Sequence, residues 1–234
     1  MKQTSIDTAW RGIARCDACA IRHLALFSEL AHDDFNRIHQ PIDELTLDRG
    51  LALYHRGDRM ASVFTVRAGL IKLVQHLPNG GFRIVRVLRQ GDVAGLERLN
   101  DRPAEHDAIA MDRVELCRIP VAVVQTLRDQ TPRLHGQLIE RWQRALADAD
   151  TWLTELSTGP ARARVARLLL HFDAVSNGEA FFLPTRDDMG AMLGITTEST
   201  SKVTAEFKRQ GWLLAAEVQH ARIDRAALST LTSA

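Results

Sequence analysis

Residues 185–212 read TRDDMGAMLGITTESTSKVTAEFKRQGW and predict two short helices separated by a glycine. Thr185 and, three residues later, Asp188 form a capping-box pattern, which marks the first turn of a helix. Gly194 provides a turn position that tolerates a positive φ angle, and Thr196 can cap the helix that follows. Helix, glycine turn and helix is the plan of a helix-turn-helix.

The second predicted helix has one apolar face and one polar face. Val203 and Phe207 recur at helical spacing and are expected to point inward. Glu198, Ser201 and Lys202 stand at positions i, i+3 and i+4, so their side chains project together. A carboxylate can accept from cytosine, a hydroxyl is permissive and an ammonium can donate to guanine. The alternative is an ordinary amphipathic helix pair with a solvated charged face.

This segment resembles the DNA-binding domain of the CRP/FNR regulators, whose recognition helix reads E-x-x-S-R in the FNR branch. Glu198, Ser201 and Lys202 occupy the matching positions. Lys202 departs from the family pattern, because lysine lacks the planar fork with which arginine binds guanine. The resemblance implies that these three residues read bases. Arg186 is a candidate phosphate contact because of its charge, and the DNA-binding set that we expect is Thr185, Arg186, Thr197, Glu198, Ser201 and Lys202.

The composition is that of an ordinary globular protein. The 234 residues are 45% apolar and 25% charged, and the formal net charge of +1 does not by itself indicate a nucleic-acid partner. No apolar run approaches the roughly 20 residues that span a bilayer, and no secretory pattern opens the chain. Three cysteines, an odd number, argue against a disulfide framework. We therefore expect a cytoplasmic protein of one or two domains without a membrane partner.

Residues 42–119 have a different pattern, in which short apolar runs alternate with glycine turns. The runs cover residues 51–54, 63–66, 70–73, 84–88 and 116–119. Short strands at regular intervals are typical of an antiparallel sandwich or barrel. Before them, residues 21–38 have helical spacing and predict one or two short helices. We therefore assign residues 1–20 to an N-terminal extension with a cysteine pair, and residues 21–131 to a β-rich domain.

The glycine register of this domain, including Gly91, Asp92 and Gly95, resembles the β-roll of cyclic-nucleotide-binding domains. The resemblance implies that residues 21–131 form a sensor. In the members that bind cAMP, a Gly-Glu pair and an Arg-Ser/Thr pair hold the cyclic phosphate. This sequence has Asp92 in place of the glutamate and Glu105 near the position of the arginine. A carboxylate at that position repels a phosphate, so no cyclic nucleotide is expected to bind.

Residues 132–157 are predicted to form one long helix with two apolar stripes. One stripe recurs at alternating spacings of three and four, as in the seam of a coiled coil. Its members are Ile139, Trp142, Leu146, Ala149, Leu153 and Leu156. The opposite stripe can pack on the chain's own domain and comprises Leu134, Leu138, Ala145 and Trp152. A single helix buried in one domain is the alternative, but two stripes favour a homodimer, which is expected to bind a palindromic DNA site.

A Ser-Thr-Gly-Pro sequence at residues 157–160 interrupts this helix and marks a linker. Residues 158–234 are therefore assigned to a separate domain, in which residues 161–171 form a helix. Residues 212–214 and 221–223 flank a polar turn and resemble the wing of a winged helix. The predicted fold is α+β, with an N-terminal antiparallel β-roll, a long dimerisation helix at residues 132–157 and a C-terminal winged helix-turn-helix.

Cys16, Cys19 and the distant Cys117 are the remaining candidate ligands. Thiolates bind zinc and iron–sulfur clusters, and a two-residue gap lets two sulfur atoms face one metal. The alternative is that Cys117 is a small buried residue of a strand and that the Cys16–Cys19 pair is incidental.

These cysteines resemble part of the [4Fe–4S] ligand set of FNR-type oxygen sensors, which includes one cysteine in a Cys-x-Ile-Pro context. Residues 117–120, Cys-Arg-Ile-Pro, match that context, whereas one further cysteine position of the family holds Ala25, for which His23 is a candidate substitute. Ala149 also replaces the aspartate whose repulsion keeps cluster-free FNR monomeric. The resemblance therefore implies a regulator with an altered oxygen switch, responding to oxygen, redox state or nitric oxide, and it implies RNA polymerase as a partner.

Two alternatives remain open. The first is a haem-based or cluster-independent regulator of the same fold. The second is a cupin-like metalloenzyme, which would need a close His-x-His pair that the sequence lacks. Because neither a glycine-rich phosphate loop nor a nucleophile elbow occurs, we expect no enzymatic activity.

Overall fold

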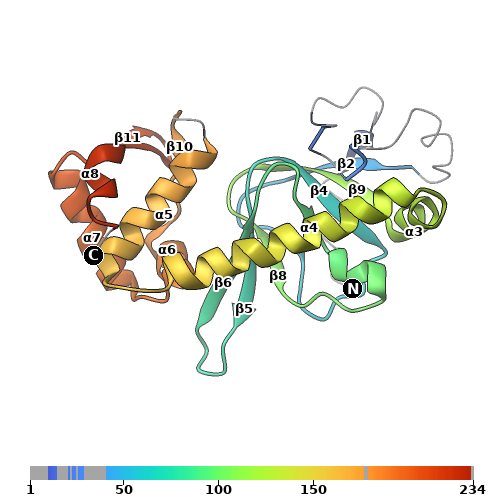
Figure 1. Cartoon of the computed structure of the whole chain (residues 1–234), viewed down its shortest axis with the longest axis horizontal. Helices are drawn as coiled ribbons and strands as arrows, with labels where there is room; N and C mark the ends of the chain where they lie inside the picture. Colours follow the sequence, from blue (N-terminus) through green and yellow to red (C-terminus); the bar gives the residue numbers. More distant parts are fainter. Residues whose placement is uncertain are drawn as a thin grey trace. The chain divides into compact units, whose positions relative to one another are not determined.

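The computed structural model describes residues 10–14, 21, 23–24, 26–28, 41–176 and 179–232 (Figure 1). Contacts divide the chain into two compact units, Met1–His76 with Val85–Ala145, and Leu77–Ile84 with Leu146–Ala234. None of the helices in this described part of the chain is long and apolar enough to cross a membrane.

Two antiparallel sheets form the body of the first unit. One has the strand order β1-β2-β9-β4-β7, and the other has the order β3-β8-β5-β6. The strands of the first sheet are β1 (Trp10–Ile13), β2 (Asp43–Leu47), β4 (Ser62–Ala68), β7 (Val93–Ala94) and β9 (Val114–Pro120). Those of the second are β3 (Ala52–Tyr54), β5 (Ile71–His76), β6 (Phe82–Leu88) and β8 (Asp107–Ala110). The predicted β-roll is confirmed.

Alternation along β9 sends its side chains to two different cores, because successive residues of a strand point to opposite faces. Val114 and Leu116 join the core between the two sheets. Cys117 and Ile119 face a second hydrophobic cluster on the outer side of the first sheet. The strand therefore connects the interior of the roll with the surface on which the helices pack.

The first sheet begins earlier than the expected boundary at residue 21. β1 lies in the predicted N-terminal extension and pairs with β2, where Gly12 stands opposite Glu44 and Ile13 opposite Asp43. Four residues that include a glycine carry too little alternation to be recognised as a strand. The helices predicted between residues 21 and 38 fall mostly outside the described residues, and the residues described there form turns.

Helices α3 (Val121–Gln130) and α4 (Pro132–Thr151) follow β9 (Figure 1). Both contribute side chains to the second hydrophobic cluster. Between β7 and β8 the short 3₁₀-helix η2 (Leu96–Asn100) adds Leu99 to the same cluster. From α4 the cluster receives Leu134 and Leu138, two members of the stripe that was predicted to pack on the chain's own domain.

Hydrogen bonds from Arg141 hold the same side of α4 on the roll. Its guanidinium nitrogens donate to the carbonyl oxygens of Gly91 and Leu24, and both N···O distances are 2.6 Å. Burial lowers the pKa of Arg141, but an arginine side chain stays protonated in proteins, so both bonds are charge-assisted. One face of α4 is therefore fixed to its own roll.

The long helix continues beyond α4 as a short π-helix, η3 (Trp152–Leu156). A π-helix turns less per residue than an α-helix, because its hydrogen bonds connect residues i and i+5. Leu153 remains exposed, but Leu156 points away from the exposed face of the helix and exposes only 2% of its surface. Leu156 therefore packs within its own chain, and its assignment to the dimer seam from strict periodicity was wrong.

The second unit is a winged helix-turn-helix, as predicted. Its helices are α5 (Ala161–Val175), α6 (Arg186–Leu193), α7 (Thr197–Arg209) and α8 (Arg225–Ser229). A three-stranded sheet of order β10-β12-β11 is formed by β10 (Phe181–Phe182), β11 (Leu213–Glu217) and β12 (His220–Ile223), and β11 with β12 makes the wing. The sequence did not predict β10 and α8, because such short elements carry little periodicity.

Candidate nucleic-acid interface

Side-chain caps and a glycine fix the ends of the two central helices. The backbone N–H of Asp188 donates to Oγ1 of Thr185, and the N–H of Ser199 donates to Oγ1 of Thr196, each at an N···O distance of 3.1 Å. Gly194 ends α6 in the left-handed conformation, with φ at 66°. These three features confirm the predicted start of α6, the turn and the start of α7.

The turn also depends on a glycine that the sequence pattern did not single out. Gly190 lies inside α6, and its carbonyl oxygen accepts the N–H groups of Gly194 at 2.8 Å and Ile195 at 3.2 Å. A Cβ atom at Gly190 would lie 2.8 Å from the carbonyl oxygen of Ile195, closer than real Cβ contacts. The backbone of the turn therefore lies directly on α6, and only glycine leaves room for it.

The inner face of α7 is buried. Thr200, Val203, Thr204 and Phe207 each expose 8% or less of their surface. The hydroxyl of Thr204 donates to the carbonyl oxygen of Thr200 at 2.8 Å, so its burial leaves no unpaired donor. Burying a phenylalanine side chain stabilises a fold by about 1.5–3 kcal/mol. Rotation of α7 about its axis would lose that contribution, so the outward face of the helix is fixed as well.

Arg162 of α5 holds the C-terminal half of α7. Its Nε and Nη2 atoms both lie 2.9 Å from Oε1 of Glu206. The guanidinium carbon lies 5.5 Å from the centroid of the Trp212 ring. Partly exposed contacts of this kind contribute about 1 kcal/mol or less each, but they orient the helix. Arg162 was not predicted, because its partner Glu206 is 44 residues away in the sequence.

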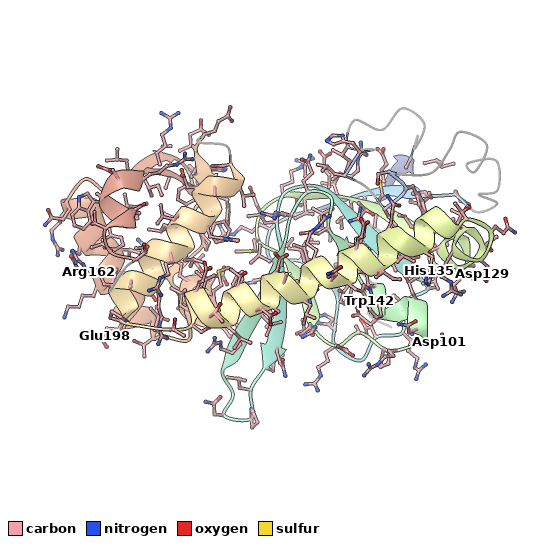
Figure 2. All side chains as sticks on the ribbon, viewed as in Figure 1. Asp101, Asp129, His135, Trp142, Arg162 and Glu198 are labelled. Atoms are coloured by element: carbon pink, nitrogen blue, oxygen red, sulfur yellow. The ribbon has the colours of Figure 1, made fainter. Side chains whose placement is uncertain are left out.

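With one face buried, α7 presents the other face to solvent. Glu198, Ser201 and Lys202 are all exposed and lie in the first two turns of the helix, where Glu198 can be seen at the surface of the second unit (Figure 2). Together they offer a hydrogen-bond acceptor, a hydroxyl that both donates and accepts, and a cationic donor. The fold therefore brings the three predicted base-reading side chains onto one accessible surface.

The other three predicted DNA-binding residues differ in their exposure and in their contacts within the fold. Thr197 is exposed, but its hydroxyl donates to Oδ1 of Asp187 at 2.7 Å and so links the first turns of α6 and α7. Thr185 caps α6, and Arg186 is half-buried on the first turn of that helix. Asp187 is a positioning residue that the sequence analysis did not identify, because only the tertiary fold brings it to Thr197.

The predicted dimer seam lies on the exposed side of α4. The exposed fractions are 56% for Ile139, 47% for Trp142, 64% for Leu146 and 66% for Leu153, while Ala149 is half-buried. Large apolar side chains that gather on one surface usually mark an interaction site. The seam residues other than Leu156 are therefore available to a partner.

The candidate metal ligands are only partly described. Cys16 and Cys19 lie outside the described residues, Cys117 is half-buried on β9, and His23 is exposed in a turn. Within the described ranges, no group of three or more His, Cys, Asp or Glu side chains is placed to hold a metal ion. Ala14 packs against the same outer cluster as Cys117, so the last described residue before Cys16 lies on the Cys117 face of the sheet.

The two acids at the expected cyclic-phosphate positions have other partners. Oδ2 of Asp92 accepts the backbone N–H of Arg89 at 2.9 Å. Oε1 of Glu105 lies 3.2 Å from Nη2 of Arg102. Neither position presents a cation to a phosphate.

The fold and the exposed face of α7 define a class of protein, namely a DNA-binding protein that joins a β-roll to a winged helix-turn-helix. Comparison with known families agrees with this class. Residues 44–131 match the cyclic nucleotide-binding domain, and residues 163–231 match the Crp-like helix-turn-helix domain.

Similar proteins identify the family. The chain is 26% identical over 217 residues to the transcriptional activator protein Anr of Pseudomonas aeruginosa, covering 90% of this chain and 88% of Anr. It is 23% identical over 201 residues to the fumarate and nitrate reduction regulatory protein of Vibrio cholerae, covering 83% and 80%. The structure of FixK2 from Bradyrhizobium japonicum has a TM-score of 0.73 at 23% identity, covering 82% of this chain and 98% of FixK2.

The chain belongs to the CRP/FNR family, near its FNR branch. It is a transcription regulator with a helix-turn-helix DNA-binding domain. The matched relatives are regulators and not enzymes, which supports the prediction that this chain is not an enzyme.

The role of Gly190 can be tested with a pair of helical glycines. Gly190→Ala is expected to push the Ile195 carbonyl away and to raise amide hydrogen exchange in α7 by about tenfold, or ~1.4 kcal/mol. Gly136→Ala in α4 is the control, because a Cβ atom there would meet nothing within 4 Å and alanine favours a helix by about 1 kcal/mol. Equal exchange in α7 for both variants would contradict the assigned role.

Proposed function

We propose that this protein is a homodimeric regulator that binds palindromic duplex DNA and reads bases in the major groove with Glu198, Ser201 and Lys202. The observation that carries the proposal is the fixed orientation of α7. Its inner face is buried, so the first two turns present these three side chains outward. The N-terminal part of a recognition helix is the part that contacts base edges.

The chemistry of the three side chains suggests a division of roles. The Glu198 carboxylate accepts from cytosine N4, and the Lys202 ammonium donates to guanine O6 or N7. Ser201 tolerates several bases because its hydroxyl both donates and accepts. Thr185, Arg186 and Thr197 complete the interface; Arg186 at the first turn of α6 suits a phosphate contact, where the helix terminus also favours an anion.

Dimerisation is proposed through the exposed stripe of α4. The stripe comprises Ile139, Trp142, Leu146, Ala149 and Leu153. The opposite face of the same helix is already fixed to the roll by Leu134, Leu138 and Arg141. A helix that packs on its own domain with one face and exposes large apolar residues on the other favours pairing with a second copy.

The signal is proposed to be oxygen, redox state or nitric oxide, received by the roll. Relatives of the chain include a protein named anaerobic regulatory protein in Aggregatibacter actinomycetemcomitans, which is 22% identical over 205 residues. A cyclic nucleotide is not expected, because Asp92 and Glu105 are anionic at the positions that would hold its phosphate. RNA polymerase as a partner and a cytoplasmic location follow from the same family assignment.

A [4Fe–4S] cluster is the favoured cofactor, with Cys16, Cys19 and Cys117 as its ligands. The sheet register places Gly12, Glu44 and Cys117 side by side on β1, β2 and β9. Two strand spacings are ~10 Å, and four extended residues from Gly12 to Cys16 span at most ~14 Å, so the chain can bring these thiolates together. Such a cluster supplies a redox-sensitive centre, but it takes four cysteines, and His23 is the proposed substitute for the fourth. Haem, or no cofactor, is the alternative.

Base reading can be tested with single substitutions on α7. Glu198→Ala and Lys202→Ala are each expected to reduce discrimination among half-site variants by about 1–3 kcal/mol. Lys208→Ala is the control, because Lys208 is exposed near the other end of α7 and should change only the salt dependence of binding. Competition binding to a panel of half-site duplexes measures both effects. Unchanged discrimination in the first two variants would refute the assigned roles.

The oligomeric state can be tested by sedimentation. Protein purified in air is expected to be a dimer at micromolar concentration, since Ala149 introduces no charge into the seam. Leu146→Glu should produce a monomer, because it buries an unpaired carboxylate. Arg144→Glu adds the same carboxylate to an exposed position of α4 outside the seam and should remain dimeric. A monomeric unsubstituted protein would count against the seam.

The cofactor can be tested by anaerobic reconstitution with iron and sulfide. The proposal predicts a visible absorption band that Cys117→Ala removes without loss of circular dichroism from the roll. Reconstitution with haem on the same samples tests the alternative. A featureless spectrum with iron and sulfide would exclude the cluster.

A further inference from the structure

Thr65 of β4 has a buried hydroxyl without a hydrogen-bond partner. The residue exposes 1% of its surface, and among the residues that the structure describes its Oγ1 atom has no partner. Almost every buried polar side chain in a protein is hydrogen-bonded, because leaving one unpaired destabilises the fold. Exceptions occur where the polar group serves a redox or catalytic centre, or binds an ion or an ordered water.

The neighbours of Thr65 along β4 show which face of the sheet its side chain occupies. Phe64 and Val66 point into the core between the two sheets, whereas Val63 belongs to the outer cluster. Because successive side chains of a strand alternate between the two faces, Thr65 points to the same side as Val63. Its hydroxyl therefore lies on the outer side of the first sheet, away from the interior of the roll.

Cys117 of β9 stands directly opposite Thr65 in the antiparallel pairing of β4 with β9. Residues that are directly opposite lie on the same face of a sheet, with their Cβ atoms about 4.5–5.5 Å apart. Cys117 also faces the outer cluster, in agreement with this register. At that separation, staggered rotamers of the two side chains bring the hydroxyl within hydrogen-bonding distance of the sulfur.

The residue opposite Cys117 on the other side is Glu44 of β2. An ionised carboxylate accepts hydrogen bonds but cannot donate one, and Oε1 of Glu44 forms an ion pair with Nη1 of Arg67. A sulfur that carries negative charge needs a donor rather than a second anion. Of the two residues directly opposite Cys117, only Thr65 can supply that donor.

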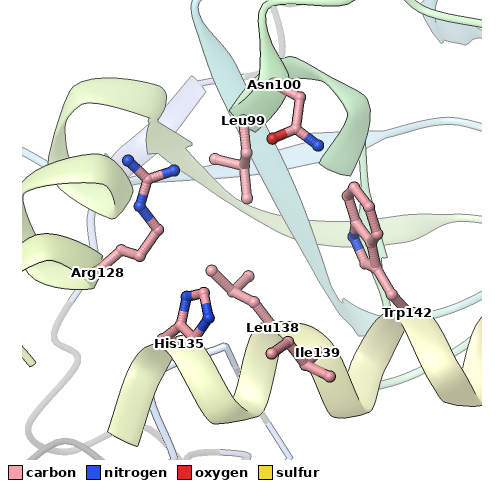
Figure 3. Close-up of a pocket in the computed structure, with 7 residues that line it drawn as sticks. All are labelled: Leu99, Asn100, Arg128, His135, Leu138, Ile139 and Trp142. Carbon is pink, nitrogen blue, oxygen red and sulfur yellow. The ribbon is translucent and has the colours of Figure 1, made fainter. Parts of the chain in front are cut away.

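The surroundings of the Thr65 hydroxyl are apolar. Val63 and Val93, which lies opposite Thr65 on β7, are both buried in the outer cluster. Leu99 of η2 and Leu138 of α4 belong to the same cluster, and Figure 3 shows them facing each other beside a half-open pocket of about 160 Å³. A hydrogen bond is stronger in such surroundings than in water, and an unpaired hydroxyl is more costly there.

We propose that the Thr65 hydroxyl donates a hydrogen bond to the sulfur of Cys117 when that cysteine holds a metal centre. Such a sulfur is an anionic acceptor, because a coordinating thiol is deprotonated. This inference rests on the proposed cofactor and deepens it, because it names a residue that tunes the centre. Hydrogen bonds to the sulfur atoms of an iron–sulfur cluster help to set its reduction potential, and a donor raises it by stabilising the more negative, reduced form.

The hydroxyl of Thr65 then has opposite effects on the two states of the protein. In the metal-free protein it is buried and unpaired, which destabilises the fold. In the metal-loaded protein it gains an anionic acceptor, and charge-assisted hydrogen bonds are stronger than neutral ones. A hydroxyl that instead binds an ordered water affects both states alike. The sign of the effect in each state therefore distinguishes the two roles.

Thr65→Val tests this role, because valine has nearly the shape of threonine but no hydroxyl. In the metal-free protein the variant is expected to raise the melting temperature by about 2–4 °C. After anaerobic reconstitution with iron and sulfide, it should lower the midpoint potential of the centre in a redox titration. It should also increase the rate at which a chelator removes the iron by about tenfold.

Two further variants serve as controls. Thr65→Ser keeps the hydroxyl, and Thr46→Val alters a half-buried threonine of β2 that pairs with Glu115 rather than with Cys117. Both should retain the potential and the iron-release rate of the unsubstituted protein. Unchanged values in Thr65→Val would overturn the proposal, as would a lower melting temperature of that variant without metal. A featureless spectrum of the reconstituted, unsubstituted protein would instead remove the cofactor itself, and this role with it.

Discussion

The close approach of the Ile195 carbonyl to Gly190 is the constraint on which the DNA-binding unit depends. It sets the separation of α6 and α7 at the turn, where no side chain fits between them. The buried face of α7 and the contact of Arg162 with Glu206 then fix the rotation of the helix and the position of its far end. The outward direction of Glu198, Ser201 and Lys202 follows from these contacts.

The two faces of α4 have different surroundings. One face is committed to its own chain, because Leu138 enters the outer cluster and Arg141 donates to two backbone carbonyls. The other face keeps Ile139 and Trp142 exposed. Cys117 packs against the same outer cluster that α4 covers. A chemical change at that cysteine would therefore act on the surface that supports α4.

Local sequence signals predicted the elements whose determinants are local. Sequence alone was enough to predict the helix caps at Thr185 and Thr196 and the turn at Gly194, because each involves residues only a few positions apart. The exposed polar face of α7 followed from helical periodicity for the same reason. Features that depend on three-dimensional contacts were not predicted. No local signal distinguishes Gly190 from other glycines in helices, and β1 is defined by its pairing with β2.

The error at Leu156 has a different origin. Heptad counting assumes a constant rotation per residue, whereas η3 is a π-helix that changes this rotation. The cysteines could be predicted only as a set of candidate residue types, because Cys16 and Cys19 lie outside the described residues and Cys117 is distant from them in sequence. Methylation protection on a duplex selected by the protein, probed at guanine N7 in the major groove and at adenine N3 in the minor groove, tests the proposed base reading most directly. Base reading by two α7 helices predicts protected guanine N7 atoms in two inverted half-sites whose centres lie about 10 base pairs apart. Protection confined to the minor groove, or to a single half-site, would contradict it.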